Sequence, residues 1–320
     1  MRVIFCGTPV FAVPALKHLL AQRDFQIVAA ITQPDRPRGR GQEISLSPVK
    51  QVALAEGIPV HQPEKIRAPE AQELLQQLAP DAIVIIAYGQ IIPGRLLGIP
   101  KLGWINLHAS LLPKYRGAAP INWAIVNGET KTGVTTMRID AGMDTGEILL
   151  QKEMSIGPLE TAPELAARMS ELGAPLMAET LRGLSAGTIV PHTQSHEHAS
   201  SAAMLKKEDG KIDWSRSAQD IFNRIRGFTP WPGAYTSFRG QSCHVWGEPA
   251  SNDSGEQNPH PGNGSNSGTL FVLGNQLLVS CGGATFLRVL SVKLEGRKQV
   301  SAAEFVNGAR LLQGEHFGQR

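Results

Sequence analysis

Two polar residues, Asn106 and His108, follow a short apolar stretch that begins at Gly103. This stretch predicts a β-strand, and alternate residues of a strand point to the same side of the sheet. The amide of Asn106 and the imidazole of His108 are therefore expected side by side, where the strand gives way to a loop. In an open α/β sheet, ligands bind beyond the carboxyl ends of the strands. This strand end is thus a candidate site.

A carboxylate, Asp144, stands in the glycine-rich turn from 140 to 146 and completes a possible set of catalytic groups. An Asn amide can donate a hydrogen bond to a carbonyl oxygen that becomes negative, an effect typically worth about 3–4 kcal/mol in the transition state. A His can accept a proton from an attacking nucleophile or donate to the same oxygen. A nearby Asp can orient the imidazole and favour its charged form. Together these groups suit attack on a carbonyl group.

No convincing covalent nucleophile accompanies these three residues. Ser110 lacks the G-x-S-x-G pattern of a nucleophile elbow, and no cysteine stands near it in the sequence. The nucleophile is therefore expected to arrive with a substrate. Each of the three residues alone would be read as an ordinary hydrogen-bonded structural residue, Asp144 as a turn aspartate. The combination is what indicates a site.

The composition is that of an ordinary globular protein. The 320 residues favour two domains, and 42% hydrophobic residues suffice for a core. A formal net charge of +3 is too small to argue nucleic-acid binding from bulk charge. No apolar run reaches membrane-spanning length, and the N-terminus has no secretory signal pattern, so we expect a cytoplasmic protein. Cys6, Cys243 and Cys281 lack CxxC spacing and are predicted to be small buried residues in a reducing compartment.

The first part of the chain predicts a Rossmann-like, mostly parallel α/β domain. A strand from 2 to 6, a helix to about Leu20 and a strand from 25 to 32 form the start of a βαβ pattern. The strongest predicted strand, 81–88, is apolar on both faces, as central parallel strands are. A nicotinamide site is disfavoured because the G-x-G-x-x-G fingerprint is missing and Gln33 replaces the expected acidic residue.

The second part predicts a small OB-like β-barrel. Residues 188–208 lose periodicity and are expected to form a linker, which divides the chain into domains 1–187 and 209–320. Short strands and a final helix after the linker are typical of such a barrel. The preceding apolar stripe predicts a helix that Pro175 breaks into two pieces. No acidic or Cys companion stands at ligand spacing from the linker histidines, which disfavours a metal site at His192, His196 and His198.

A long irregular loop from 33 to 50, the arginine loop, carries Arg36, Arg38 and Arg40. Loops of this length in a compact domain are usually functional or disordered. For an arbitrary sequence, a solvated mobile loop would be the preferred interpretation. The alternative is a loop that contacts phosphate, because the guanidinium geometry suits phosphate oxygens. A second irregular stretch, 250–267, is predicted to be an exposed insertion in a hairpin.

At these residues the sequence resembles the methionyl-tRNA formyltransferase family of folate-dependent formyltransferases. The resemblance covers nearly the whole chain and is highly specific, and the insertion at 250–267 is its least typical part. The matching segments are Phe5–Pro9, Thr32–Pro37 with Gly39–Gly41, Ala87–Gly89, Asn106 and His108 with Ser110–Pro113, Arg116–Pro120, Asp144–Gly146, Ile212–Trp214 and Pro230–Pro232.

The resemblance implies formyl transfer from 10-formyltetrahydrofolate to the α-amino group of methionine on initiator tRNA. Asn106 and His108 would polarise the formyl carbonyl and hold the oxyanion, while Asp144 would orient His108. The folate-contacting residues carried over from the family are Ser110, Leu111, Leu112 and Pro113, and those expected to line the pterin pocket are Ile86, Ala87, Tyr88 and Gly89.

The resemblance also overturns the solvated interpretation of the arginine loop. It implies that Arg40, helped by Arg36 and Arg38, contacts the tRNA, and that the C-terminal barrel holds the tRNA largely through backbone phosphates. The expected protein is a monomeric enzyme without a metal or a membrane partner.

Three competing functions remain at this stage. A folate-dependent formyltransferase acting on a small amine, such as an amino sugar nucleotide, would share the chemistry but would not need the arginine loop. A nonenzymatic RNA-binding protein would not need Asn106, His108 and Asp144 together. A nicotinamide oxidoreductase is disfavoured by the missing glycine fingerprint.

Overall fold

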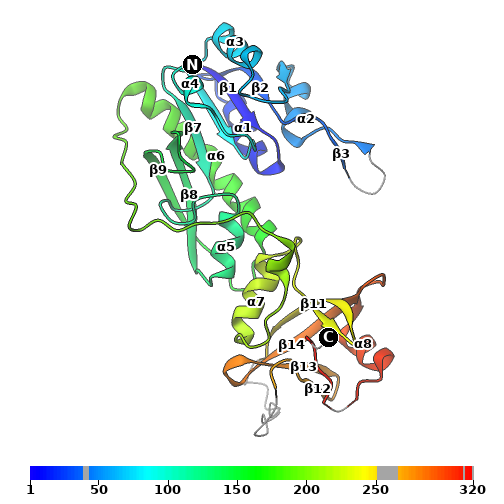
Figure 1. Ribbon diagram of the computed structural model, residues 1–320. Helices are drawn as coiled ribbons and strands as arrows, with labels where there is room; N and C mark the ends of the chain where they lie inside the picture. Colours follow the sequence, from blue (N-terminus) through cyan, green and yellow to red (C-terminus); the bar gives the residue numbers. More distant parts are fainter. Residues whose placement is uncertain (39–42, 251–265, 313, 319–320) are drawn as a thin grey trace. The chain divides into compact units, whose positions relative to one another are not determined.

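The computed structural model describes residues 1–38, 43–250, 266–312 and 314–318 and divides the chain into two compact units (Figure 1). The C-terminal unit takes in two short segments from the earlier part of the chain, 121–130 and 156–163. The N-terminal unit comprises Met1–Pro120, Lys131–Ser155 and Glu164–Ala203, and the C-terminal unit comprises Ile121–Thr130, Ile156–Pro163 and Met204–Arg320.

A seven-stranded sheet forms the centre of the N-terminal unit (Figure 1). Its order is β5-β2-β1-β6-β7-β8-β9; the first five strands in this order run parallel, whereas β8 and β9 are antiparallel to their neighbours. The mostly parallel Rossmann-like sheet predicted from the sequence is therefore confirmed. The strands are β1 (Arg2–Gly7), β2 (Gln26–Ile31), β5 (Val60–His61), β6 (Ala82–Ile86), β7 (Trp104–His108), β8 (Lys131–Arg138) and β9 (Ile148–Ser155).

Both faces of this sheet are covered at its centre. Every residue of the apolar strand Ala82–Ile86 is buried, and alternate residues of a strand point to opposite faces. One face packs against α3 and α4 through a cluster that contains Leu75, Leu96 and Trp104. The helices of this part of the chain are α1 (Val13–Leu20), α2 (Pro48–Ala55), α3 (Pro69–Leu78), α4 (Gly94–Leu97) and α6 (Ala162–Ala186), and α5 (Pro120–Val126) stands between β7 and β8.

Helix α6 continues through Pro175, so the predicted break at this proline is wrong. Proline removes one helical hydrogen bond and crowds the carbonyl four residues earlier. Pro175 lies on the exposed side of the helix, whereas Leu165 before it and Leu181 after it are fully buried. Burial of one continuous apolar stripe outweighs the lost hydrogen bond. The helix also lies close to β7, since a Cβ on Gly173 would stand 2.4 Å from the side chain of Leu107.

The C-terminal unit contains an antiparallel sheet of order β10-β11-β14-β13-β12, with β15 paired to β14. The predicted small β domain is confirmed as a separate antiparallel sheet, in which a two-residue turn at Gly274 joins β12 to β13. Its elements are α7 (Ala218–Gly227), β10 (Tyr235–Phe238), β11 (Gln241–Pro249), β12 (Leu270–Leu273), β13 (Gln276–Cys281), β14 (Thr285–Leu294), β15 (Val300–Ser301) and α8 (Ala302–Ala309).

The three cysteines are free and buried, as the sequence predicted. Burial raises the pKa of the Cys243 and Cys281 thiols to about 12, so neither is a reactive thiolate at neutral pH. Across the described ranges, no helix combines the length and the apolar character that a membrane crossing requires.

Candidate active site

The site is built at the end of β7, where Asn106 and His108 lie on the same side of the sheet as Trp104. His108 is 6% exposed, whereas Asn106 is half-buried. Within the described part of the chain, the Asn106 side chain has no hydrogen-bond partner. Its amide is therefore available to a ligand that enters from the solvent side.

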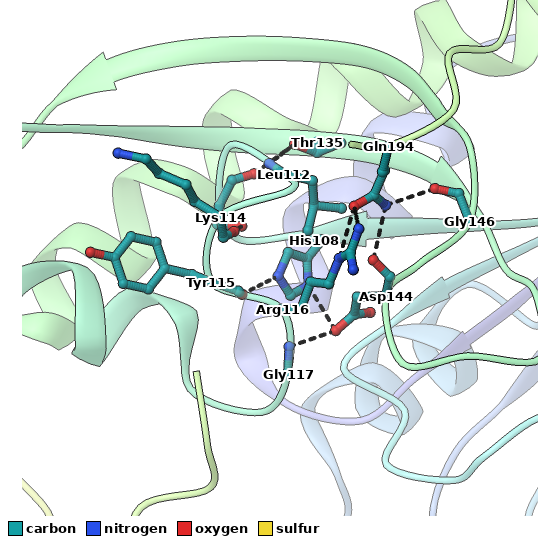
Figure 2. A network of polar contacts seen from close by, with 11 residues as sticks. His108, Leu112, Lys114, Tyr115, Arg116, Gly117, Thr135, Asp144, Gly146 and Gln194 are labelled. Atoms are coloured by element: carbon teal, nitrogen blue, oxygen red, sulfur yellow. Dashed lines mark hydrogen bonds and ion pairs between the residues drawn. The ribbon is translucent and has the colours of Figure 1, made fainter. Parts of the chain in front are cut away.

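Both ring nitrogens of His108 face oxygen atoms (Figure 2). Nε2 lies 2.8 Å from the carbonyl oxygen of Tyr115, and Nδ1 lies 3.6 Å from Oδ2 of Asp144. A carbonyl oxygen can only accept a hydrogen bond, so Nε2 must carry the proton. Nδ1 is consequently the nitrogen that can take up a second proton, and an imidazolium formed there would be stabilised by the carboxylate.

Asp144 reaches His108 because the segment from 139 to 147 folds back after β8. Its backbone is left-handed (φ 53°), a conformation that Asp tolerates better than most residues. Oδ2 of Asp144 accepts a 2.8 Å hydrogen bond from the backbone N–H of Gly117, so the same oxygen faces both Gly117 and His108 (Figure 2). At the start of the turn, Asp140 accepts hydrogen bonds from the Gly142 N–H and the Thr145 hydroxyl, which hold the turn closed.

The loop after β7 is held by its own polar groups. The Ser110 hydroxyl donates to the carbonyl of Lys114 at 2.6 Å, and the Thr135 hydroxyl donates to the carbonyl of Ser110 at 2.6 Å. Ser110 is fully buried and its hydroxyl is engaged in this way, so it shapes the loop and is not placed as a nucleophile. Of the four residues expected to contact folate here, Leu111 and Pro113 carry exposed surface, whereas Ser110 and Leu112 are buried.

The segment after β6 divides in the same way. Ile86 and Tyr88 are 0% and 2% exposed, and Tyr88 belongs to the apolar cluster on one face of the sheet. Ala87 and Gly89 are exposed and have left-handed φ angles of 47° and 88°. Any ligand at this strand end would therefore contact Ala87 and Gly89, whereas Ile86 and Tyr88 are part of the buried core beneath the surface.

The three arginines expected to contact tRNA are described to different extents. Arg36 is exposed, and its guanidinium lies 4.0 Å from Glu64 in a pair that is open to solvent. Arg38 lies in β3 (Pro37–Arg38), which pairs with β4 (Glu43–Ile44) as a short antiparallel ladder that the sequence did not predict. Arg40 lies outside the described residues. The same holds for most of the insertion predicted at 250–267.

A polar network that the sequence does not predict lies at the base of the arginine loop. Lys50 Nζ, from α2, binds the carboxylate of Asp35 and donates to Oε1 of Gln62 at 2.6 Å. Gln62 in turn donates to the carbonyl of Gln33 at 2.8 Å. The hydrogen bond from Lys50, assisted by one from Gln62, holds the pKa of Asp35 below its usual value. The network thereby ties the two ends of the arginine loop together.

Replacement of this lysine gives a pH-dependent prediction. Because the pKa of Asp35 is lower in the folded chain than in the unfolded chain, its contribution to stability is fully present above about pH 5 and is lost as the pH falls through the folded-state pKa. We expect Lys50→Met to lower the thermal unfolding midpoint by about 2–4 °C at pH 7 and by much less at pH 2–3. Circular dichroism melts across this range check it, with Lys17→Met in α1 as an exposed control. A difference that is constant with pH would contradict the role of the Asp35 carboxylate.

Comparison with known proteins identifies the family. The formyl transferase profile matches residues 1–181, and the profile of the formyl transferase C-terminal domain matches residues 204–310. The chain belongs to the formyl transferase family. This formyl transferase is 52% identical over 320 residues to the methionyl-tRNA formyltransferase of Solibacter usitatus, covering 100% of this chain and 99% of the relative. It is 50% identical over 321 residues to the methionyl-tRNA formyltransferase of Koribacter versatilis, again covering 100% and 99% of the two chains.

Solved structures share the fold of this formyl transferase at lower identity. The N-formyltransferase from Helicobacter canadensis, whose structure holds folinic acid and dTDP-3-aminofucose, superposes with a TM-score of 0.64 at 20% identity. The superposition covers 90% of this chain and 98% of the other. At this identity the likeness establishes the shared fold, while the relatives near 50% identity carry the functional comparison.

Proposed function

We propose that this formyl transferase moves a formyl group from 10-formyltetrahydrofolate to the α-amino group of methionyl initiator tRNA. The observation that carries the proposal is identity of about half the residues, over the full length, to chains named methionyl-tRNA formyltransferase. The small-amine alternative is supported only by a fold shared at 20% identity. The free amide of Asn106 and the paired His108 and Asp144 supply the chemistry that formyl transfer requires.

The reaction begins with attack by the neutral amine on the formyl carbon. A free α-amino group has a pKa of about 8, so a neutral fraction is present near pH 7. As the new C–N bond forms, the carbonyl electrons move onto oxygen, and the Asn106 amide donates a hydrogen bond to this oxyanion. Donation from His108 to the same oxygen requires Nε2 to leave the Tyr115 carbonyl, so Asn106 is the immediate oxyanion donor.

Proton transfer completes the reaction. The attached amine becomes acidic, and its proton passes to Nδ1 of His108, where Asp144 stabilises the imidazolium. The bond between the formyl carbon and folate N10 then breaks, the oxyanion reforms the carbonyl, and N10 takes up the proton. The products are formylated methionyl-tRNA and tetrahydrofolate.

The folate donor is assigned to the surface between the ends of β6 and β7. Ala87 and Gly89 on one side, with Leu111 and Pro113 on the other, offer exposed backbone and apolar side chains near Asn106. Folinic acid in the Helicobacter canadensis structure supports a folate-type donor for this fold.

The tRNA is assigned to the arginine loop and the C-terminal unit, and this assignment gives a salt-dependence prediction. We expect Arg36→Ala and Arg40→Ala each to raise the KM for methionyl-tRNA several-fold and to reduce the slope of log KM against log salt by about 1. Initial rates at several salt concentrations between 50 and 200 mM provide the measurement. An unchanged slope would mean that the arginine loop is a solvated surface loop that does not contact the tRNA.

The acceptor is tested by direct competition. The full chain is given the labelled formyl donor with equal concentrations of methionyl initiator tRNA and an amino sugar nucleotide. Label is expected on the tRNA-bound methionine. Label on the sugar amine instead would favour the small-amine alternative, and the uncharged tRNA serves as the control for nonspecific labelling.

A further inference from the structure

The segment from His192 to Ala202, expected to be part of a linker, runs against both loops of the site; we call it the strap. At its start, His192 and Ile148 exchange backbone hydrogen bonds of 2.8 and 2.9 Å. At its end, the N–H of Arg116 donates to the carbonyl of Ser200 at 2.8 Å, and the N–H of Ala202 donates to the carbonyl of Arg116 at 2.7 Å. The strap thus joins the end of the turn that carries Asp144 to the loop that follows His108.

Gln194 lies between these two attachments and is 3% exposed. Its amide nitrogen donates to the carbonyls of Asp144 at 2.9 Å and Gly146 at 2.7 Å. Its amide oxygen accepts from Nε of Arg116 at 3.0 Å and from Nη2 at 2.7 Å. Both N–H donors of the Gln194 amide therefore bind the turn that carries Asp144, and its oxygen binds Arg116 in the loop that follows His108 (Figure 2).

The residues that Gln194 contacts are the ones that hold His108 and Asp144 in place. Arg116 stands between Tyr115, whose carbonyl meets His108 Nε2, and Gly117, whose N–H meets Asp144 Oδ2. Asp144 has a left-handed backbone, which costs some free energy even for an aspartate and is stabilised by contacts with its surroundings. The Gln194 amide supplies part of that stabilisation through the Asp144 carbonyl.

We propose that Gln194 is a positioning residue for formyl transfer: it sets the spacing between the Asp144 turn and the Tyr115–Gly117 segment, and thereby keeps the Asp144 carboxylate against His108 Nδ1. The inference rests on the proposed function of Asp144 and His108. Gln194 contacts neither reacting atom and acts through Asp144.

The test is a double-mutant cycle with Asp144. Gln194→Met keeps the length of the side chain and removes its donors and acceptor. Alone it is expected to lower kcat about 10–100-fold, with the KM for the formyl donor changed less than about threefold. In an Asp144→Asn background the same change is expected to lower kcat by less than about threefold, because the interaction through which it acts is already gone. Equal effects in the two backgrounds would overturn the inference.

Two further variants separate positioning from folding. Gln22→Met replaces a half-buried glutamine that accepts a hydrogen bond from Arg182 far from the site, and it should leave kcat unchanged. If Gln194→Met does not fold, as judged by its circular dichroism melt, Gln194→Asn is used in the same cycle, since it keeps the amide but cannot span both loops. The cycle is measured with whichever amine the wild-type chain formylates. If the wild-type chain does not formylate methionyl-tRNA, the proposed function is wrong. If the effects of the Gln194 and Asp144 substitutions on kcat are additive, the positioning role of Gln194 is wrong.

Discussion

His108→Ala is expected to lower kcat for formyl transfer by about 10³-fold, while the formyl donor still binds. The substitution removes Nδ1, the nitrogen that faces Asp144 and can accept the proton of the attached amine. It also leaves the Tyr115 carbonyl and the Asp144 carboxylate without their shared partner. Single-turnover rates with saturating donor and methionyl-tRNA measure the chemical step separately from product release.

The control for this prediction must address folding, because His108 is buried. Titration of donor binding by intrinsic fluorescence, together with a circular dichroism melt, shows whether the variant keeps its pocket. His18→Ala in α1 is the matched substitution away from the site and should retain the wild-type rate. A His108→Ala variant that folds, binds the donor and turns over at the wild-type rate would remove His108 from the mechanism.

Asn106→Ala is expected to lower kcat by about 10²–10³-fold, the usual loss when one oxyanion donor is removed. Unlike His108, the Asn106 side chain makes no hydrogen bond to another described residue, so its loss should leave the unfolding midpoint nearly unchanged. A large fall in kcat without a loss of stability would indicate that the Asn106 amide acts on the substrate. Measured kcat and thermal melts for Asn106→Ala and for Asn307→Ala, an exposed control in α8, test it.

Loss of stability equal to that of His108→Ala, or a fall in kcat below about threefold, would contradict the oxyanion role. In that case Asn106 would be a structural residue of β7, and another donor would have to meet the formyl oxygen.

The central sheet and the strand-end pair were predictable from the sequence for a physical reason. A buried parallel strand is apolar at nearly every position, and this pattern stands out at 81–88. The two-residue period of a strand then places Asn106 and His108 on one side without further information. By contrast, local propensity wrongly predicts a break at Pro175, because buried apolar residues on both sides of the proline keep α6 continuous.

The remaining contacts of the site join segments that carry no local signal of their meeting. Asp144 reaches His108 only because the turn after β8 folds back, and the sequence suggested the pair through chemistry and resemblance alone. Gln194 lies in a stretch without periodicity, where a glutamine reads as a solvated residue. Lys50 and Asp35 likewise meet across the ends of a long loop. Such contacts depend on how loops pack, and packing is decided by the whole fold.

One measurement tests the central claim most directly. The full chain is incubated with 10-formyltetrahydrofolate labelled in its formyl group and with methionyl initiator tRNA, and the amino acid is then released and identified. The account predicts labelled N-formylmethionine and one equivalent of tetrahydrofolate for each formyl group transferred, with the initial rate of its formation strongly reduced in both His108→Ala and Asn106→Ala. Absence of formylmethionine with the wild-type chain, or an unreduced initial rate in both variants, would contradict the account.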